Sequence, residues 1–321
     1  MEGQWYTPVS DDLEEVNNNI TGVLRSERPE LQEMCDYLTS SGGKKIRPAM
    51  CILAHRACGG SGTEEVHRIA SAFEMIHLAT LVHDDINDRS EIRRGRRTVH
   101  KEYTVTKAII LGDFIFAMGF KLVGSTDEKV VNVMVDASAA MAESEFIQKE
   151  FEHMPVVTED DYMRIIRGKT AMPIFAAARA GAYLANASEK MINAVSDFAL
   201  DVGLAFQIAD DVLDVIGDHR STGKNVGIDI VEGKPTLPVI YAMSDPVAGK
   251  KIKAIFEKSD ITDAERKEAL NLIKGTDAVD RCLSKARSLA ESAIPKLSCI
   301  PDSEYKNSLI GLARHAAGRD R

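Results

Sequence analysis

The sequence predicts an all-α protein in which residues 1–321 form a single domain. Three observations lead to this fold class. Apolar residues recur at three- and four-residue spacings along much of the chain, which is the period of one helix face. Proline, the strongest helix breaker, is absent between Pro48 and Pro155. Alternating apolar and polar runs that end in hairpin turns, the mark of strands, are scarce.

The expected helices follow in order along the chain. The clearest apolar stripe covers residues 64–86, and similar patterns cover residues 107–123, 130–151, 174–184 and 190–216. Capping-box sequences at Thr158 and Thr262 predict two further helix starts. A glycine-rich connection at 217–238 is too long for a simple turn, and loops of that length commonly act as lids or lack structure. Shorter amphipathic helices are expected at 246–258, 262–274 and 279–294.

Composition narrows the class of protein further. Hydrophobic residues make up 44% of the chain and charged residues 28%, as in a soluble globular protein, and the net charge of −9 argues against a nucleic-acid binder. The five cysteines are scattered without a CxxC motif, which excludes a thiolate zinc site and favours a reducing, cytoplasmic location. We expect no signal peptide in residues 1–16 and no membrane-spanning segment.

Two acidic clusters interrupt apolar helices. The sequence DDIND from Asp84 to Asp88 ends one stripe, and DDVLD from Asp210 to Asp214 lies near the end of another. Helix positions four apart differ by only about 40°, so the outer aspartates of the first cluster share a face with His77. Like charges four apart destabilise a helix by roughly 0.2–0.5 kcal/mol, so the clusters need a counter-charge. All-oxygen ligands without thiolates or paired histidines favour magnesium.

Basic motifs accompany the acidic clusters. GGKKIRP (42–48), RRGRR (93–97) and GKT (168–170) are the main ones, and Lys224 and Lys234 lie in the glycine-rich connection. Each alone is common on protein surfaces. Together with two metal-binding clusters they indicate a substrate with clustered negative charge. Because the sequence has no Walker A motif, no GxGxxG after a strand and no kinase HRD, a diphosphate ester of an apolar group is a better candidate than a nucleotide.

The motifs, taken in their order along the chain, resemble those of the trans-isoprenyl diphosphate synthases, also called polyprenyl synthetases. GGKKIRP, HLATLVHDDINDRSEIRRGRRTVH, GDFIFAMGF, GKTA and GLAFQIADDVLDVIGDHRSTGKNVGIDIVEGKPTLPVIYA carry the resemblance, which spans residues 42–242. It implies the isoprenoid synthase fold, an all-α bundle around a deep central cavity, normally as a homodimer. The implied reaction is the magnesium-dependent, head-to-tail condensation of isopentenyl diphosphate with an allylic diphosphate.

The resemblance also assigns roles to individual residues. The aspartates that face one another across the cavity and hold magnesium, three ions per active site, would be Asp84, Asp85, Asp88, Asp210, Asp211 and Asp214. The isopentenyl diphosphate pocket would contain Lys44, Arg47, His77 and Arg94. The allylic diphosphate would be bound by Arg93, Lys169, Thr170, Gln207, Lys224 and Lys234. MAESEFIQ resembles another family segment, in which Ser144 stands where glycine is common and Gln148 is placed to contact the second metal motif.

The residues before the first cluster bear on product length. Family members that make farnesyl diphosphate usually carry an aromatic four or five positions before the first aspartate, where this chain has Thr80 and Ala79. We therefore expect products longer than farnesyl, from geranylgeranyl to hexaprenyl. Deeper positions leave further room or supply the floor of the tunnel, and these are Met75, Ile76, Phe73, Phe116 and Phe120.

Two other classes of protein share some of these features. Terpene cyclases and head-to-head condensing enzymes also use acidic motifs with magnesium, but they lack the GGKKIRP and RRG motifs of a second, homoallylic substrate. A non-catalytic subunit of a heteromeric synthase would be expected to have lost aspartates, whereas all six are present. The sequence therefore favours an active, chain-elongating synthase.

Overall fold

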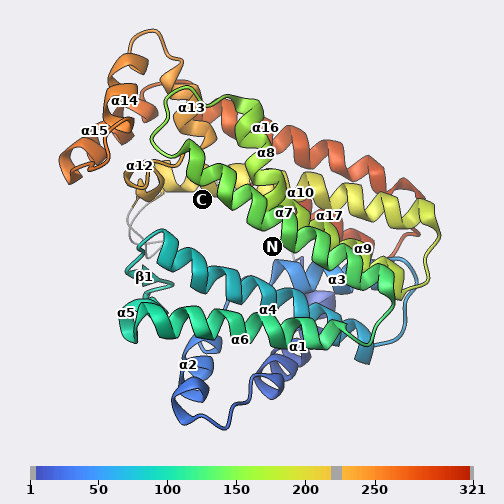
Figure 1. Cartoon of the computed structure of the whole chain (residues 1–321). Helices are drawn as coiled ribbons and strands as arrows, with labels where there is room; N and C mark the ends of the chain where they lie inside the picture. The colour runs from blue at the N-terminus through green and yellow to red at the C-terminus, as the bar shows by residue number, and fades with distance from the viewer. Residues whose placement is uncertain (1–4, 218–225, 319–321) are drawn as a thin grey trace. The chain divides into compact units, whose positions relative to one another are not determined.

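The computed structural model describes residues 5–217 and 226–318 (Figure 1). Almost all of the secondary structure in these residues is helical, and the strands form one two-stranded hairpin. The predicted all-α class is therefore confirmed. The five long helices expected from the apolar periodicity are present, each with bounds within two residues of the prediction.

The chain divides into two compact units. The first comprises Met1–Asp136, Ala176–Ser196 and Cys299–Leu309, and the second comprises Ala137–Phe175, Asp197–Ser298 and Ile310–Arg321. Four α-helices contribute residues to both units, namely α7 (Glu128–Phe151), α9 (Met172–Leu184), α10 (Glu189–Ile216) and α17 (Glu304–Ala317), and the last residue of η3 (Ile294–Cys299) also falls in the first unit. The single domain over residues 1–321 stays a prediction.

The first unit is built around α4 (Glu64–Asn87), which packs against α1 (Ser10–Val23), α3 (Ile46–Ala57) and α6 (Val105–Val123). Helix α4 carries buried residues on nearly every side, as expected for a helix at the centre of its unit. The remaining elements of this unit are η1 (Thr7–Val9), α2 (Pro29–Thr39), β1 (Ile92–Arg93), β2 (Arg96–Arg97) and α5 (Val99–Glu102).

Helices α4 and α6 run side by side in Figure 1 and approach closely at a glycine. A Cβ atom on Gly112 of α6 would lie 2.1 Å from Nε2 of His83 on α4. Only a residue without a side chain fits at this position unless the imidazole moves. Gly112 thus leaves room for the His83 ring between the two helices, near the first aspartate cluster.

The RRGRR motif forms the hairpin, which sequence periodicity did not predict. Strands β1 and β2 pair antiparallel, with Arg93 opposite Arg96. The two turn residues, Arg94 and Gly95, have φ angles of 52° and 75°. Positive φ at both central residues is the mark of a type I′ two-residue hairpin turn.

The second unit gathers its helices around α13 (Leu237–Met243), which packs against four neighbours. These are α8 (Glu159–Ile166), α14 (Gly249–Phe256), α15 (Asp263–Lys274) and α16 (Ala278–Ala293). The capping boxes predicted at Thr158 and Thr262 are both present, at the starts of α8 and α15. The remaining short elements are the π-helical turn η2 (Arg167–Ala171), α12 (Ile228–Val231) and η3 (Ile294–Cys299).

None of the helices within residues 5–217 and 226–318 is long and apolar enough to cross a membrane.

Candidate functional site

The first aspartate cluster occupies the C-terminal end of α4. Asp84 and Asp85 lie in its last turn, and Asp88 is the C-cap residue. The C-terminal end of a helix carries a partial negative charge, so three carboxylates there are electrostatically unfavourable without nearby cations. The local fold therefore concentrates negative charge where a cation would be strongly attracted.

Part of this charge is balanced by an arginine of the hairpin. Asp85 is only 4% exposed, and its Oδ1 accepts a hydrogen bond of 2.6 Å from Nε of Arg93. This is a charge-assisted contact, which is stronger than a hydrogen bond between neutral groups. Arg93 was assigned to the allylic diphosphate, so the structure places it directly at the first cluster.

The predicted isopentenyl diphosphate residues lie near this end of α4. Burial lowers the pKa of Arg47 and of Arg94, while the charge of Glu74 on α4 acts to raise both. The carboxylate of Asp84 also raises the pKa of Arg47. Glu74 is 3% exposed and its charge is felt by Lys45 as well. Sequence reasoning missed Glu74, because an acidic residue in an apolar stripe carries no motif of its own.

His77 is held neutral in this environment. Burial lowers its pKa well below the usual value, and the positive charges of Arg47, Arg94 and Arg93 lower it further. Lys44, in contrast, is exposed in the loop before α3. The structure thus brings Arg47, His77 and Arg94 together, and the loop of Lys44 passes beside Arg94, which is also exposed.

The predicted chain-length residues lie on α4 and α6. Met75, Ile76 and Ala79 are buried, and the first two line the close approach of α6 at Gly119. Phe116 and Phe120 of α6 stack on each other with ring centroids 6.0 Å apart. Phe73 is also buried, while Thr80 is half-buried. Their influence on product length stays a prediction.

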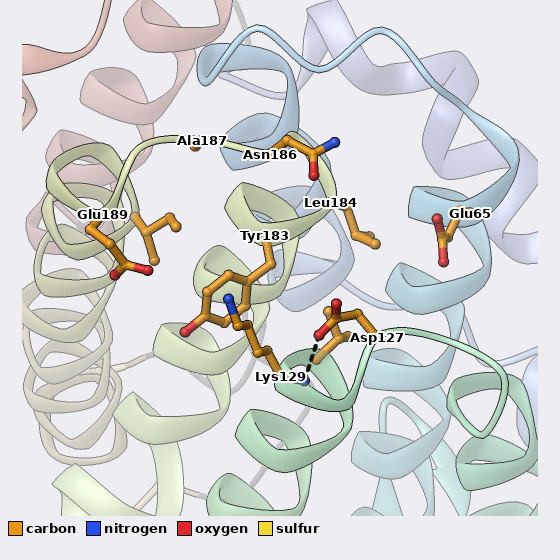
Figure 2. Close-up of a pocket in the computed structure, with 10 residues that line it drawn as sticks. Glu65, Asp127, Lys129, Tyr183, Leu184, Asn186, Ala187 and Glu189 are labelled. Atoms are coloured by element: carbon orange, nitrogen blue, oxygen red, sulfur yellow. Dashed lines mark hydrogen bonds between the residues drawn. The ribbon is translucent and has the colours of Figure 1, made fainter.

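A cavity of about 320 Å³ in the first unit contains none of the predicted site residues (Figure 2). Its walls come from the start of α4, the α6–α7 connection and the α9–α10 connection, with Tyr183 and Lys129 pointing toward each other in the view. The ammonium of Lys129 lies 5.9 Å from the centre of the Tyr183 ring. This cavity is separate from the residues that the motifs single out.

The second aspartate cluster lies in the last two turns of α10. Like the first cluster, it is therefore at the C-terminal end of its helix, which carries a partial negative charge. Its central member, Asp211, is 6% exposed. Asp211 Oδ2 accepts a hydrogen bond of 2.6 Å from the hydroxyl of Tyr162, and Oδ1 accepts one of 2.7 Å from Nε2 of Gln207. Burial raises the pKa of Asp211 well above its usual value, and the neighbouring carboxylates of Asp229 and Asp210 add to this. Asp210 itself is exposed.

Asp214 fixes the start of the short helix α12. Its carboxylate accepts hydrogen bonds from the backbone N–H groups of Ile228 (3.3 Å) and Asp229 (3.2 Å), and its backbone carbonyl accepts one from Gly227 (2.8 Å). Gly227 has a φ of 79°, which favours glycine. This arrangement brings the carboxylate of Asp229 close to Asp211, a neighbour that the sequence motifs did not reveal.

The π-helical turn η2 presents the GKT motif to α10. Thr170 Oγ1 donates a hydrogen bond of 2.7 Å to Oε1 of Gln207. Nζ of Lys169 donates to Oε2 of Glu145 at 2.5 Å and to Oε1 of Gln148 at 3.3 Å. Such turns occur frequently at functional sites. The structure therefore brings Lys169, Thr170 and Gln207 together, as the motifs predicted.

One pocket of about 100 Å³ in the second unit collects these side chains. Its lining includes Gln148, Tyr162, Lys169, Thr170, Gln207, Asp211, Asp229 and Lys234. Lys234 also forms an ion pair of 2.7 Å with Glu232. Lys224, assigned to the allylic diphosphate, lies outside the described residues.

The donor set of this pocket fits magnesium carried by a diphosphate. Among the described residues no three His, Cys, Asp or Glu side chains already converge as a set that could hold a metal ion. Magnesium is usually bound by one or two carboxylates, with water and substrate phosphates as the other ligands, so a complete protein cage is not required. Nε2 of Gln148 is buried without a hydrogen-bond partner in the described part of the chain, which suits a phosphate oxygen as acceptor.

Comparison with known proteins identifies the family. A model of the polyprenyl synthetase family matches residues 28–273. The chain is 35% identical to the octaprenyl diphosphate synthase of Haemophilus influenzae, over 96% of this chain and 94% of the relative. It is 34% identical to heptaprenyl diphosphate synthase component 2 of Geobacillus stearothermophilus, over 98% of both chains.

Its fold is similar to a crystal structure of a polyprenyl synthase from Caulobacter crescentus complexed with calcium and isoprenyl diphosphate. The TM-score is 0.93 at 34% identity, covering 98% of this chain and 96% of that one. The family predicted from the motifs and the isoprenoid synthase fold are thereby confirmed. This chain belongs to the polyprenyl synthetase family of prenyltransferases.

Proposed function

We propose that the chain is a magnesium-dependent synthase that condenses isopentenyl diphosphate head-to-tail with an allylic diphosphate to give an all-trans polyprenyl diphosphate. The observation that carries this proposal is the pocket of the second unit. There a buried carboxylate, Asp211, lies with Lys169, Thr170 and Lys234 in one small cavity. Anionic and cationic groups in such proximity suit a metal–diphosphate ligand, which carries charges of both signs.

In this mechanism the side chains of the second unit bind the allylic diphosphate and orient its carbon–oxygen bond for cleavage. Lys169 and Lys234 attract the phosphate oxygens, and Thr170 and Gln207 add hydrogen bonds. When bound, magnesium stabilises the negative charge that develops on the departing diphosphate. Charge stabilisation of this kind is usually one of the largest contributions to catalysis.

The cationic residues around α4 bind the second substrate. Arg47 and Arg94 would bind the diphosphate of isopentenyl diphosphate, and His77, whose lowered pKa favours the neutral ring, would add a hydrogen-bonding group without adding charge. The double bond of the held substrate then attacks the allylic cation, and an apolar environment keeps water from quenching it. We assign the final proton loss to the released pyrophosphate. Discovery of an essential side-chain base by mutagenesis would contradict this assignment.

The product is longer than farnesyl in this proposal. The names of two similar synthases give octaprenyl and heptaprenyl products, which exceed the hexaprenyl upper end of the range expected from Thr80 and Ala79. We therefore extend the proposed range from geranylgeranyl to octaprenyl. The small side chains at these two positions support a long tunnel, because they leave no aromatic wall next to the first cluster.

Assembly and location remain part of the proposal. A homodimer is expected from the resemblance, whereas one similar protein is named as component 2 of its synthase, so a second kind of subunit is the alternative. Light scattering on the purified chain distinguishes them. All five cysteines are free thiols, which supports a reducing compartment such as the cytoplasm.

The test is incubation of the purified chain with isopentenyl diphosphate and dimethylallyl, geranyl or farnesyl diphosphate, with magnesium or with EDTA. We expect elongated diphosphates from geranylgeranyl upward with magnesium, and none with EDTA. Cyclic hydrocarbons, or products formed without isopentenyl diphosphate, would instead support a cyclase or a head-to-head enzyme. No product from any primer would support a subunit of a heteromeric synthase.

A further inference from the structure

Tyr162 lies beside the second aspartate cluster, although it belongs to no motif that the sequence singles out. It is one turn into α8, and the Thr158 capping box fixes the start of this helix. The whole residue is 2% exposed, so burying its hydroxyl demands a hydrogen-bond partner. That partner is Oδ2 of Asp211, at 2.6 Å.

A second, independent contact holds the other oxygen of the same carboxylate. Gln207 donates to Asp211 Oδ1, and Thr170 of the π-helical turn donates to Gln207. Both oxygens of Asp211 are thus held by neutral donors that approach from different elements, α8 and α10. Rotation of the carboxylate about its Cβ–Cγ bond would break both bonds. Each oxygen still has a lone pair available for a further ligand.

We infer that Tyr162 is a positioning residue for the reaction, whose hydroxyl fixes the orientation in which Asp211 meets the metal–diphosphate ligand. This inference rests on the proposed function, since it needs Asp211 to face that ligand. Tyr162 itself need not touch substrate, because its effect passes through Asp211. Partners that orient a ligating carboxylate in this way typically change metal affinity or activity by roughly 10–100-fold when they are removed.

The experiment compares Tyr162→Phe with a matched control. Tyr241→Phe removes a hydroxyl from the same unit that also donates to a carboxylate, Oε2 of Glu159 at 2.7 Å, but lies outside the pocket. Binding of Mn²⁺ in the presence of inorganic pyrophosphate is measured by electron paramagnetic resonance, and thermal unfolding is followed alongside. We expect roughly tenfold or greater weakening of Mn²⁺ binding for Tyr162→Phe and less than a twofold change for Tyr241→Phe.

Equal Mn²⁺ binding by Tyr162→Phe and the wild type would overturn the inference while leaving the proposed function intact. A wild type that neither elongates substrates nor binds Mn²⁺ with pyrophosphate would overturn both. Tyr162→Phe removes one of the hydrogen bonds to the buried carboxylate of Asp211 and could therefore fold poorly. A second pair of variants tests the inference in that case. In the Asp211→Asn background, adding Tyr162→Phe is expected to change Mn²⁺ binding less than twofold, because the tyrosine acts through that carboxylate. A further tenfold loss in this background would contradict the inference.

Discussion

The ends of α4 and α10 carry the same DDxxD pattern, but the protein surrounds them differently. At the end of α4, Asp85 contacts the guanidinium of Arg93, and Arg47 lies in the field of Asp84. At the end of α10, Asp211 is held by a phenol and an amide, with the carboxylate of Asp229 nearby. In the first environment an arginine bonds directly to the buried aspartate, whereas in the second neutral donors bond to it and the lysines of the pocket, Lys169 and Lys234, pair with Glu145 and Glu232.

The same DDxxD spacing therefore does not give the aspartates the same effect on folding stability. Asp85 is buried and its partner Arg93 is half-buried, so loss of Arg93 would leave a buried carboxylate without this bond, and the pair contributes to folding. An aspartate buried beside other carboxylates opposes folding unless a cation binds, as its raised pKa indicates. We expect the first cluster to matter for stability as well as activity, and the central residue of the second to matter mainly for activity.

Asp211→Asn gives the largest expected effect. Removing the negative charge of a proposed metal ligand should lower kcat by roughly 10²–10³-fold, comparable to the loss of a strong electrostatic contact in other active sites. The thermal midpoint should be unchanged or higher, because one of several crowded carboxylates is gone. Steady-state assays and calorimetry measure the two effects. Asp160→Asn, at an exposed position on α8, is the control. A kcat of Asp211→Asn within tenfold of wild type would contradict the proposed difference between the two clusters.

Asp85→Ala should instead destabilise the fold. It removes the acceptor of the 2.6 Å bond from Arg93, and we expect the free energy of unfolding to fall by about 2 kcal/mol. Urea unfolding without magnesium isolates this effect from metal binding. Glu91→Ala breaks a more exposed ion pair with Lys101 in the same region and should cost roughly 0.5 kcal/mol or less. Equal costs for the two variants would show that Arg93 contributes little to stability.

Two glycines near the clusters allow a further comparison, in which each is replaced by alanine and the change in unfolding free energy is measured. A Cβ on Gly168 would lie 1.8 Å from Oγ of Ser144 and 2.7 Å from the backbone oxygen of Ala140, whereas a Cβ on Gly112 would meet only the His83 ring among its closest neighbours. A side chain can rotate away but a backbone carbonyl cannot. We expect Gly168→Ala to cost roughly 1–3 kcal/mol in unfolding free energy and Gly112→Ala clearly less.

The double variant Ser144→Gly with Gly168→Ala tests the source of that cost. It removes the serine hydroxyl but leaves the Ala140 carbonyl, so it should recover only part of the lost stability. Full recovery would assign the whole effect to Ser144. This residue stands where glycine is common in the family, and here the missing side chain at position 168 makes room for it.

Ala79→Phe should have the smallest effect on rate and act on product length. An aromatic ring placed before the first cluster is expected to shift the product distribution toward shorter chains without changing the requirement for magnesium. Chromatography of the dephosphorylated products measures the shift. Ile110→Phe, at a position on α6 that is 53% exposed, is the control and should leave the distribution unchanged. An unchanged distribution for Ala79→Phe would defeat the tunnel argument.

Much of the fold was predictable because it depends on local rules. The apolar pattern at 64–86 predicted α4 almost to the residue, because this long apolar run contains no proline to break it. The capping boxes at Thr158 and Thr262 identified helix starts because their hydrogen bonds close within four residues. The hairpin at 92–97 was missed, because each strand is two residues long and shows no alternation.

The site was predictable only as far as motifs extend. Lys169, Thr170, Gln207 and Asp211 were assigned from their motifs, and the structure places them around one pocket. Tyr162 and Glu74 were not, because each looks like an ordinary core position and acquires its role from a partner brought near by folding. The sequence pointed only weakly to Asp229. It is an acidic residue two positions after Gly227, in the glycine-rich connection whose length already suggested a functional role. Which of these residues would bind a metal ion stays a prediction.

The uncharged state of His77 makes the fold sensitive to acid. An unfolded imidazole takes up a proton near pH 6.5, while in the folded chain burial and three guanidinium groups delay that uptake to lower pH. The folded state therefore loses free energy relative to the unfolded state as pH falls below 6.5, by up to about 1.4 kcal/mol per pH unit, until the ring protonates in place. Above pH 6.5 this contribution is fully present, so acidification lowers the stability of the fold through His77 before any carboxylate titrates at its ordinary value.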